Sequence, residues 1–137
     1  MTHKIPTDLA DLARHLYTTA SSKGWHEKDR PVPEIVALLH SEASELFEEH
    51  RAGREPTEVY FNHPDRPGSS AFPDDPEEAV ALAASGVKPE GPPVELADLV
   101  IRCLDAAEEW GIDIAHIIRL KDAYNCTRPY KHGNKRA

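Results

Sequence analysis

Two short motifs in this sequence place acidic residues at the spacing that a metal site on helices requires. Glu42 and Glu45 are three positions apart in EASE, and Glu95 and Asp98 are three positions apart in ELAD. Side chains three or four positions apart share one face of an α-helix. If the two helices face each other, four carboxylates converge, and oxygen ligands in that number suit Mg²⁺, with Mn²⁺ as the alternative.

The residues around both motifs bear on whether these carboxylates are surface charges. Glu42 and Glu45 continue the apolar face of their helix. The segment 93–110 is apolar around most of its circumference, and its one polar stripe consists of Glu95, Asp98, Arg102 and Asp105. Carboxylates are costly to bury unless they are paired or bind a metal. The two motifs together therefore indicate a site, although a solvated acidic surface stays the alternative interpretation.

A second group of polar residues lies toward the C-terminus. Isoleucines at helical spacing between Ile114 and Ile118 predict the buried stripe of a further helix. Polar residues continue and follow this face: Lys121, Asn125, Arg128 and Lys131. Such side chains at the end of a buried stripe could bind phosphate oxygens. The alternative is that Lys121 extends from the helix edge into solvent.

One aromatic residue, Trp25, precedes the second predicted helix in the segment KGWHEKDR. A single tryptophan is usually part of the core. A partly exposed tryptophan can also serve as a platform on which a nucleotide base stacks. The residues alone leave both interpretations open.

Composition and charge exclude several classes of protein. The 137 residues carry a formal net charge of −8, which argues against general nucleic-acid binding because phosphate contacts need a basic surface. Residues 119–137 are the exception, with six basic residues and one acid. No apolar run approaches the ~20 residues of a membrane span, and the first residues lack the apolar core of a secretory signal. With two cysteines, the sequence predicts a cytoplasmic protein with reduced thiols.

Hydrophobic periodicity predicts a single all-α domain over residues 1–137. Four helices are expected at about 7–22, 33–52, 93–110 and 113–128, with Thr7 and Asp113 as N-caps. A proline-rich insertion at roughly 54–92 separates the second helix from the third and should be mostly loop. Within it, we expect one short helix from Pro76 to about Gly86 and one short strand at 58–61.

Three segments in this order resemble the MazG-like all-α NTP pyrophosphohydrolase superfamily. They are HSEASELFEE, KPEGPPVELADLVIRCLD and IIRLKDAYNCTRPYKHGNK, which cover the second to fourth helices and the basic segment. The pattern of the superfamily is ExxE, then ExxD, then a basic KxxxN-type segment. It is matched here by Glu42, Glu45, Glu95, Asp98, Lys121 and Asn125.

The resemblance implies a four-helix bundle that forms a homodimer or homotetramer. It also implies Mg²⁺-dependent cleavage of a nucleoside triphosphate between its α- and β-phosphates, which gives the monophosphate and pyrophosphate. The carboxylates of Glu42, Glu45, Glu95 and Asp98 would then be metal ligands. We expect Glu45 to act as the general base that takes a proton from the attacking water. Trp25 would stack on the base of the nucleotide. The substrate phosphates would contact Lys121, Asn125, Arg128 and Lys131.

Two departures from the superfamily pattern bear on the site and on the substrate. Ser41 stands where many members have a further glutamate, and the insertion is longer than in many relatives. A different class of function also stays open, namely a non-catalytic helical protein whose acidic stripe binds a basic partner. The sequence disfavours a helical phosphohydrolase of the HD type, because it has no His-Asp dipeptide. It also disfavours a di-iron carboxylate bundle, because neither acidic motif is a Glu-x-x-His pair.

Overall fold

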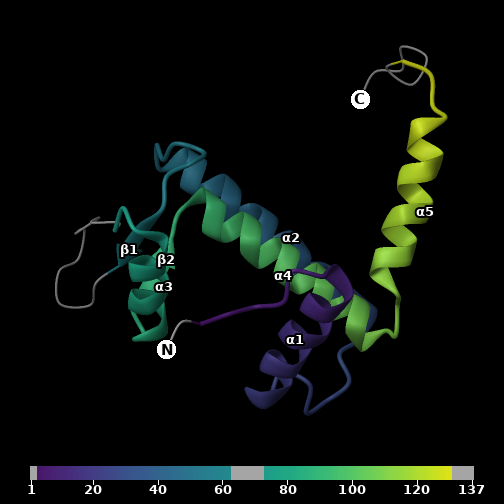
Figure 1. The fold of residues 1–137 in the computed structure, drawn as a ribbon, viewed down its shortest axis with the longest axis horizontal. Coiled ribbons are helices and arrows are strands. Elements are labelled where there is room, and N and C mark those ends of the chain that lie inside the picture. Colours follow the sequence, from purple (N-terminus) through teal and green to yellow (C-terminus); the bar gives the residue numbers. More distant parts are fainter. Residues whose placement is uncertain (1–2, 63–72, 131–137) are drawn as a thin grey trace.

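The computed structural model describes residues 3–62 and 73–130, and these residues are mostly helical. Five helices and two short strands occur in them (Figure 1). In chain order they are α1 (Leu9–Ser22), α2 (Val32–Arg51), β1 (Tyr60–Asn62), α3 (Pro76–Ala84), β2 (Lys88–Glu90), α4 (Pro92–Glu109) and α5 (Ile114–Cys126). The prediction of a mostly helical chain is therefore confirmed, and each of the four long helices lies close to its predicted range.

The helix termini have local causes in the sequence. Helix α1 is capped by Asp8, whose carboxylate accepts hydrogen bonds from two backbone N–H groups of the first turn. The N-cap predicted at Thr7 is wrong by one residue, because the carboxylate of Asp8 satisfies the N–H groups that lack a partner within the helix. Asp113 caps α5 as predicted, by accepting from the N–H of His116. Helix α2 begins beside prolines, whose fixed backbone angle suits a first turn.

Helix α4 lies at the centre of the fold. It packs against both α1 and α2, and Figure 1 shows α2 and α4 side by side with opposite chain directions. The core between these helices consists of small and aliphatic side chains, each at most 4% exposed: Ala13, Ile35, Leu104, Ala106 and Ala107. Alanine at the contacts lets the helix axes approach closely, and burial of these apolar side chains stabilises the packing.

The insertion forms a small unit at one end of the α2–α4 pair. Strands β1 and β2 pair antiparallel, with Phe61 opposite Pro89, and α3 lies between them in the chain. The short helix starting at Pro76 is confirmed, and β1 overlaps the predicted strand. Strand β2 was not predicted, because a three-residue segment with a central proline carries no alternating pattern. Residues 63–72 of the insertion lie outside the described residues.

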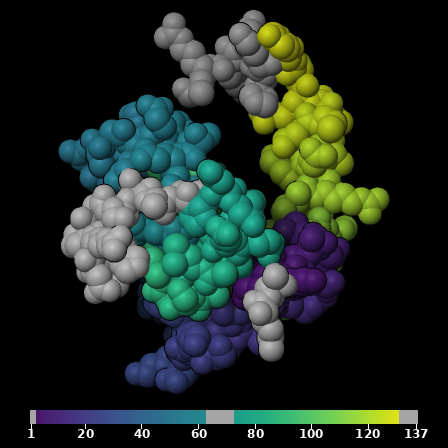
Figure 2. Space-filling view, turned by 60° about the vertical axis from the view of Figure 1, so that its left-hand side comes forward, coloured from purple at the N-terminus to yellow at the C-terminus, as the bar shows by residue number. Residues whose placement is uncertain are grey.

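Helix α5 extends away from the other helices, as both the ribbon and the space-filling view show (Figures 1 and 2). It contacts α1 and α4, yet every residue from His116 to Tyr130 is exposed. The buried stripe predicted on this helix is therefore not formed within one chain, since Ile117 and Ile118 are 44% and 49% exposed. None of the described helices has the combination of length and apolar character that crossing a membrane requires.

Gly91, which joins β2 to α4, should tolerate alanine less well than Gly53 does. Both glycines have positive φ, at +118° and +85°. A Cβ at Gly91 would lie 2.2 Å from the carbonyl oxygen of Glu58, whereas a Cβ at Gly53 would meet no atom within 4 Å. We expect Gly53→Ala to cost about 1–2 kcal/mol of unfolding free energy, and Gly91→Ala to cost more. Urea denaturation followed by circular dichroism measures both, and equal costs would contradict the close contact at Gly91.

Candidate metal centre

Three of the four predicted carboxylates meet between α2 and α4. Each of Glu42, Glu95 and Asp98 offers one carboxylate oxygen, and these oxygens lie within 4.8 Å of one another. The side chains of Glu42 and Glu95 are buried, although both are charged types. Antiparallel packing produces this group, because it sets the middle of α2 against the first half of α4. Three carboxylate oxygens at this separation form a donor set that fits a hard divalent cation such as Mg²⁺.

The fourth predicted ligand, Glu45, lies beside this group and not within it. Its residue is exposed, and its Oε1 accepts a hydrogen bond of 3.3 Å from the hydroxyl of Ser41. Ser41 is the residue at which the sequence departs from the superfamily pattern, and here it contacts a neighbouring carboxylate. The charge of Glu45 nevertheless acts on the group, because it is one cause of the raised pKa of Glu95.

We call the carboxylates of Glu42, Glu95 and Asp98 the acidic group. The protein compensates their negative charge only in part. Burial raises the pKa of Glu95, and the carboxylates of Glu45 and Asp98 raise it further. Burial also raises the pKa of Asp98, to which the charge of Glu42 adds. Both shifts mean that the ionised forms are less stable in the folded chain than in water. A bound divalent cation would relieve this cost, because it attracts all the carboxylates at once.

Two basic side chains that the sequence did not assign to the site lie next to the acidic group. Arg102 donates a hydrogen bond from Nε to Glu42, and its guanidinium is 5.7 Å from the ring of Trp25. Lys88 of β2 donates to Glu90 at 3.0 Å; this bond raises the pKa of Lys88, as do the charges of Glu95 and Glu45. The position of Arg102, four residues after Asp98 on the same stripe, was the available signal for it. Nothing in the sequence pattern indicated Lys88, since its placement depends on β2.

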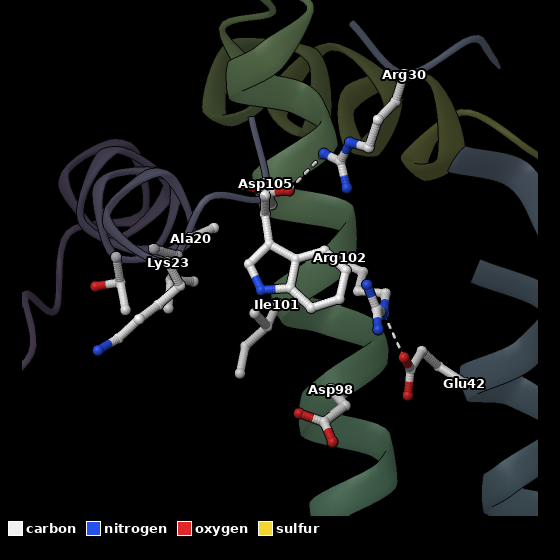
Figure 3. A pocket seen from close by; sticks show the side chains of 11 residues that line it. Ala20, Lys23, Arg30, Glu42, Asp98, Ile101, Arg102 and Asp105 are labelled. Atoms are coloured by element: carbon white, nitrogen blue, oxygen red, sulfur yellow. Dashed lines mark hydrogen bonds and ion pairs between the residues drawn. The ribbon is translucent and has the colours of Figure 1, made fainter. Parts of the chain in front are cut away.

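A second group of possible ligands occurs near the end of α4, and an arginine already contacts both of its carboxylates. His26, Asp105 and Glu109 also bring ligand atoms within 4.8 Å of one another. Arg30, however, donates to Asp105 at 2.9 Å (Figure 3) and also to Glu109 at 2.5 Å. Burial alone would lower the pKa of the Arg30 guanidinium, but the hydrogen bonds to Glu109 and Asp105 outweigh it and raise that pKa. A guanidinium between the carboxylates disfavours a second cation there.

A cavity of about 370 Å³ opens beside the acidic group. Its walls come from α1, α4, the segment between α1 and α2, and Glu42 of α2. Figure 3 shows Asp98, Arg102 and Glu42 along one side of this space, with Ile101 nearby. Trp25 lines the cavity and is 54% exposed, which excludes the interpretation of this residue as core. Two carboxylates of the acidic group, those of Glu42 and Asp98, therefore share with an aromatic side chain a space large enough for part of a small ligand.

The predicted phosphate-binding residues do not reach the acidic group within one chain. Lys121 and Asn125 lie on α5 and Arg128 follows it, and all three are exposed. Figure 1 shows that α5 extends away from α2 and from most of α4, the two helices that carry the carboxylates. The ammonium group of Lys121 is 4.9 Å from the ring of Tyr124 on the same helix. Lys131 lies outside the described residues.

No protein-family model, curated protein or solved structure gives a significant match to this chain. The interpretation of the site therefore depends on the order of the motifs in the sequence and on the geometry between α2 and α4.

Replacing Glu95 by glutamine should stabilise the metal-free protein and remove its response to metal. The substitution keeps the shape of the side chain and removes a buried charge that its neighbours repel. We expect the Tm of the metal-free variant to exceed that of the wild type by about 3–6 °C for each kcal/mol of unfavourable charge energy removed. Adding MnCl₂ should not change the Tm of the variant. The matched control is Glu48→Gln, an exposed carboxylate on α2, which should leave both values unchanged. A lower Tm for Glu95→Gln without metal would contradict this.

The stability gained by Glu95→Gln should depend on pH in a defined direction. Because the pKa of Glu95 is raised in the folded protein, its ionised form costs stability at neutral pH. As the pH falls through that raised pKa toward the ordinary value of about 4.3, wild-type Glu95 becomes neutral and the cost disappears. The Tm difference between variant and wild type should therefore be largest near neutral pH and shrink in acid. Thermal denaturation across a pH series without metal measures it.

Proposed function

We propose that this protein is a Mg²⁺-dependent nucleoside triphosphate pyrophosphohydrolase of the MazG-like all-α type. The reaction would cleave a ribo- or deoxyribonucleoside triphosphate to the monophosphate and pyrophosphate. The observation that carries the proposal is the meeting of Glu42 from the ExxE motif with Glu95 and Asp98 from the ExxD motif between α2 and α4, next to a cavity lined by Trp25. Such a donor set would hold Mg²⁺, and the cavity would hold the nucleoside.

Each residue of the site would have a separate task in this reaction. Water attacks the α-phosphorus, the bond to the bridging oxygen breaks, and pyrophosphate leaves while a base takes the proton of the water. Glu45 is our candidate for this base, because its carboxylate adjoins the other three and is held by Ser41. Glu42, Glu95 and Asp98 would hold Mg²⁺, which neutralises the phosphates and polarises the reacting phosphorus. Trp25 would stack on the base of the nucleotide.

The exposed apolar side chains support assembly of two or four copies of this chain. Leu120 and Tyr124 on α5 are 60% and 59% exposed, and Leu96 and Val100 on α4 are 52% and 48% exposed. Apolar patches of this kind usually mark interfaces. We propose that a second copy covers them and thereby completes the four-helix bundle. Lys121 and Arg128 of one copy would then approach the acidic group of the other, where they would bind phosphate oxygens.

The decisive experiment is incubation of the purified protein with a panel of ribo- and deoxyribonucleoside triphosphates and MgCl₂. We expect monophosphate and pyrophosphate in equal amounts, separated by ion-exchange chromatography. Asp98→Asn should lower kcat/KM by about 100-fold or more, because loss of a metal ligand removes several kcal/mol of charge stabilisation. A diphosphate product would exclude cleavage at the α-phosphorus. Absence of turnover together with absence of a Mn²⁺-dependent Tm shift would instead support a non-catalytic helical partner protein.

Complementation between two inactive variants tests whether the site is shared. Lys121→Ala should weaken triphosphate use and leave Mn²⁺ affinity intact, whereas Asp98→Asn should lose Mn²⁺ binding. If α5 of one copy completes the site of another in a dimer, denaturing and refolding the two variants together should restore about a quarter of wild-type activity. No restoration, or sedimentation of a 15.2 kDa monomer at micromolar concentration, would contradict the shared site.

A further inference from the structure

The segment 23–31, which joins α1 to α2, holds Trp25 at the cavity with little packing of the indole itself. More than half of the Trp25 side chain is exposed, and its backbone N–H donates to the carbonyl of Ala20 at 3.2 Å. An indole in this position would sample several orientations unless its neighbours in the chain were fixed. The structure provides that restraint through two other side chains of the same segment.

His26 fixes the segment directly after Trp25. The side chain of His26 is 8% exposed, and its ring stacks on Tyr17 of α1 with 4.2 Å between the ring centroids. Its Nε2 lies 2.8 Å from Asp105 Oδ1, and its Nδ1 lies 3.6 Å from Glu109 Oε1. One buried ring therefore connects the segment to both α1 and α4.

Arg30 fixes the other end of the segment to the same two carboxylates. Its guanidinium donates to Asp105 Oδ2 at 2.9 Å and to Glu109 Oε2 at 2.5 Å, and the side chain is 10% exposed. Charged hydrogen bonds with this little solvent contact are stronger than those on a surface. We call the four residues His26, Arg30, Asp105 and Glu109 the loop clamp.

Stability alone does not account for the loop clamp. Replacement of a buried ionic group by apolar side chains of similar volume is often neutral or stabilising. Moreover, His26 Nδ1 and Arg30 Nε are buried without a hydrogen-bond partner among the described residues, which costs stability. A positioning role does account for it, because Asp105 lies on the same face of α4 as Asp98 and Arg102, and one rigid helix relates them all.

We propose that His26 and Arg30 are positioning residues, which hold the indole of Trp25 at a fixed distance from the acidic group by tying its segment to Asp105 and Glu109. The inference rests on the proposed function in that the ligand of the cavity is taken to be a nucleotide whose base contacts Trp25. Loosening the loop clamp should then weaken nucleotide binding without altering the reacting end of the substrate. The effect should therefore fall on KM and leave kcat nearly unchanged.

The test uses His26→Phe, which keeps an aromatic ring against Tyr17 and removes the hydrogen bond to Asp105. All variants carry Trp110→Phe, so that Trp25 is the only tryptophan and its fluorescence reports on the segment. We expect stronger quenching by acrylamide, a KM for the preferred triphosphate raised by about 5-fold or more, and kcat within about 2-fold. Mn²⁺ affinity, measured by calorimetry, should not change.

Three further variants separate positioning from general loss of stability. Arg30→Lys keeps the charge, but its shorter side chain does not reach the place of the terminal guanidinium nitrogen that contacts both carboxylates, so it should give the same pattern as His26→Phe. His26→Gln can still donate to Asp105 and should restore part of the affinity. Lys28→Ala, at an exposed residue of the same segment, should behave as wild type.

The outcomes for the loop clamp and for the proposed function are distinguishable. Unchanged quenching and unchanged KM in both His26→Phe and Arg30→Lys would overturn the positioning role. A fall in kcat with unchanged KM would also overturn it, because the effect would then lie at the metal centre. If the wild-type chain hydrolyses no triphosphate, the proposed function fails, and acrylamide quenching of Trp25 alone decides whether the loop clamp fixes the indole.

Discussion

The candidate metal centre depends on the contact between α2 and α4, because this contact brings carboxylates from both helices together in one place. Small side chains such as Ala106 let the helices approach, and Glu42 then faces the first turns of α4. Burial of these carboxylates and the repulsion between them oppose the apolar packing that surrounds them, as the raised pKa values of Glu95 and Asp98 indicate. The fold thus keeps an energetically costly arrangement that a bound divalent cation would stabilise.

Helix α4 carries two groups of acidic residues, which the surrounding cations make different. At its C-terminal end, Asp105 and Glu109 share the guanidinium of Arg30 and lie against His26, so one cation offsets part of the charge of both carboxylates. Nearer its N-terminus, Arg102 contacts Glu42 while Glu95 and Asp98 make no salt bridge within the described residues. The first group is suited to holding a segment of chain in place, and the second to binding a cation.

Helix α5 differs from the other long helices in its surroundings, because none of its residues is buried. Its apolar residues have helical spacing, yet Leu120 and Tyr124 are mostly exposed. Within a single chain, neither α1 nor α4 covers this surface beyond the start of α5. The helical spacing of these apolar residues, which predicted a buried stripe from the sequence, is therefore an argument that another protein surface covers α5. Burial of apolar area stabilises association as it does folding.

The sequence by itself determined the four long helices and the helix faces that carry the acidic residues. Helical periodicity located the four long helices, and Asp113 identified one N-cap. The three-residue spacing within two pairs, Glu42 with Glu45 and Glu95 with Asp98, indicated which faces carry the acids. These features are local, because a helix relates residues three and four positions apart whatever surrounds it.

Only the tertiary structure decided which of these residues meet, and with which cations. The pairing of His26 and Arg30 with Asp105 spans more than 70 positions, and the place of Lys88 depends on a strand that shows no pattern of its own. The structure also leaves Glu45 beside the carboxylate group and keeps Lys121 on α5, an exposed helix that extends away from α2 (Figure 1). Contacts between distant segments depend on how whole helices pack, and periodicity within one helix carries no information about the neighbour that its polar face will meet.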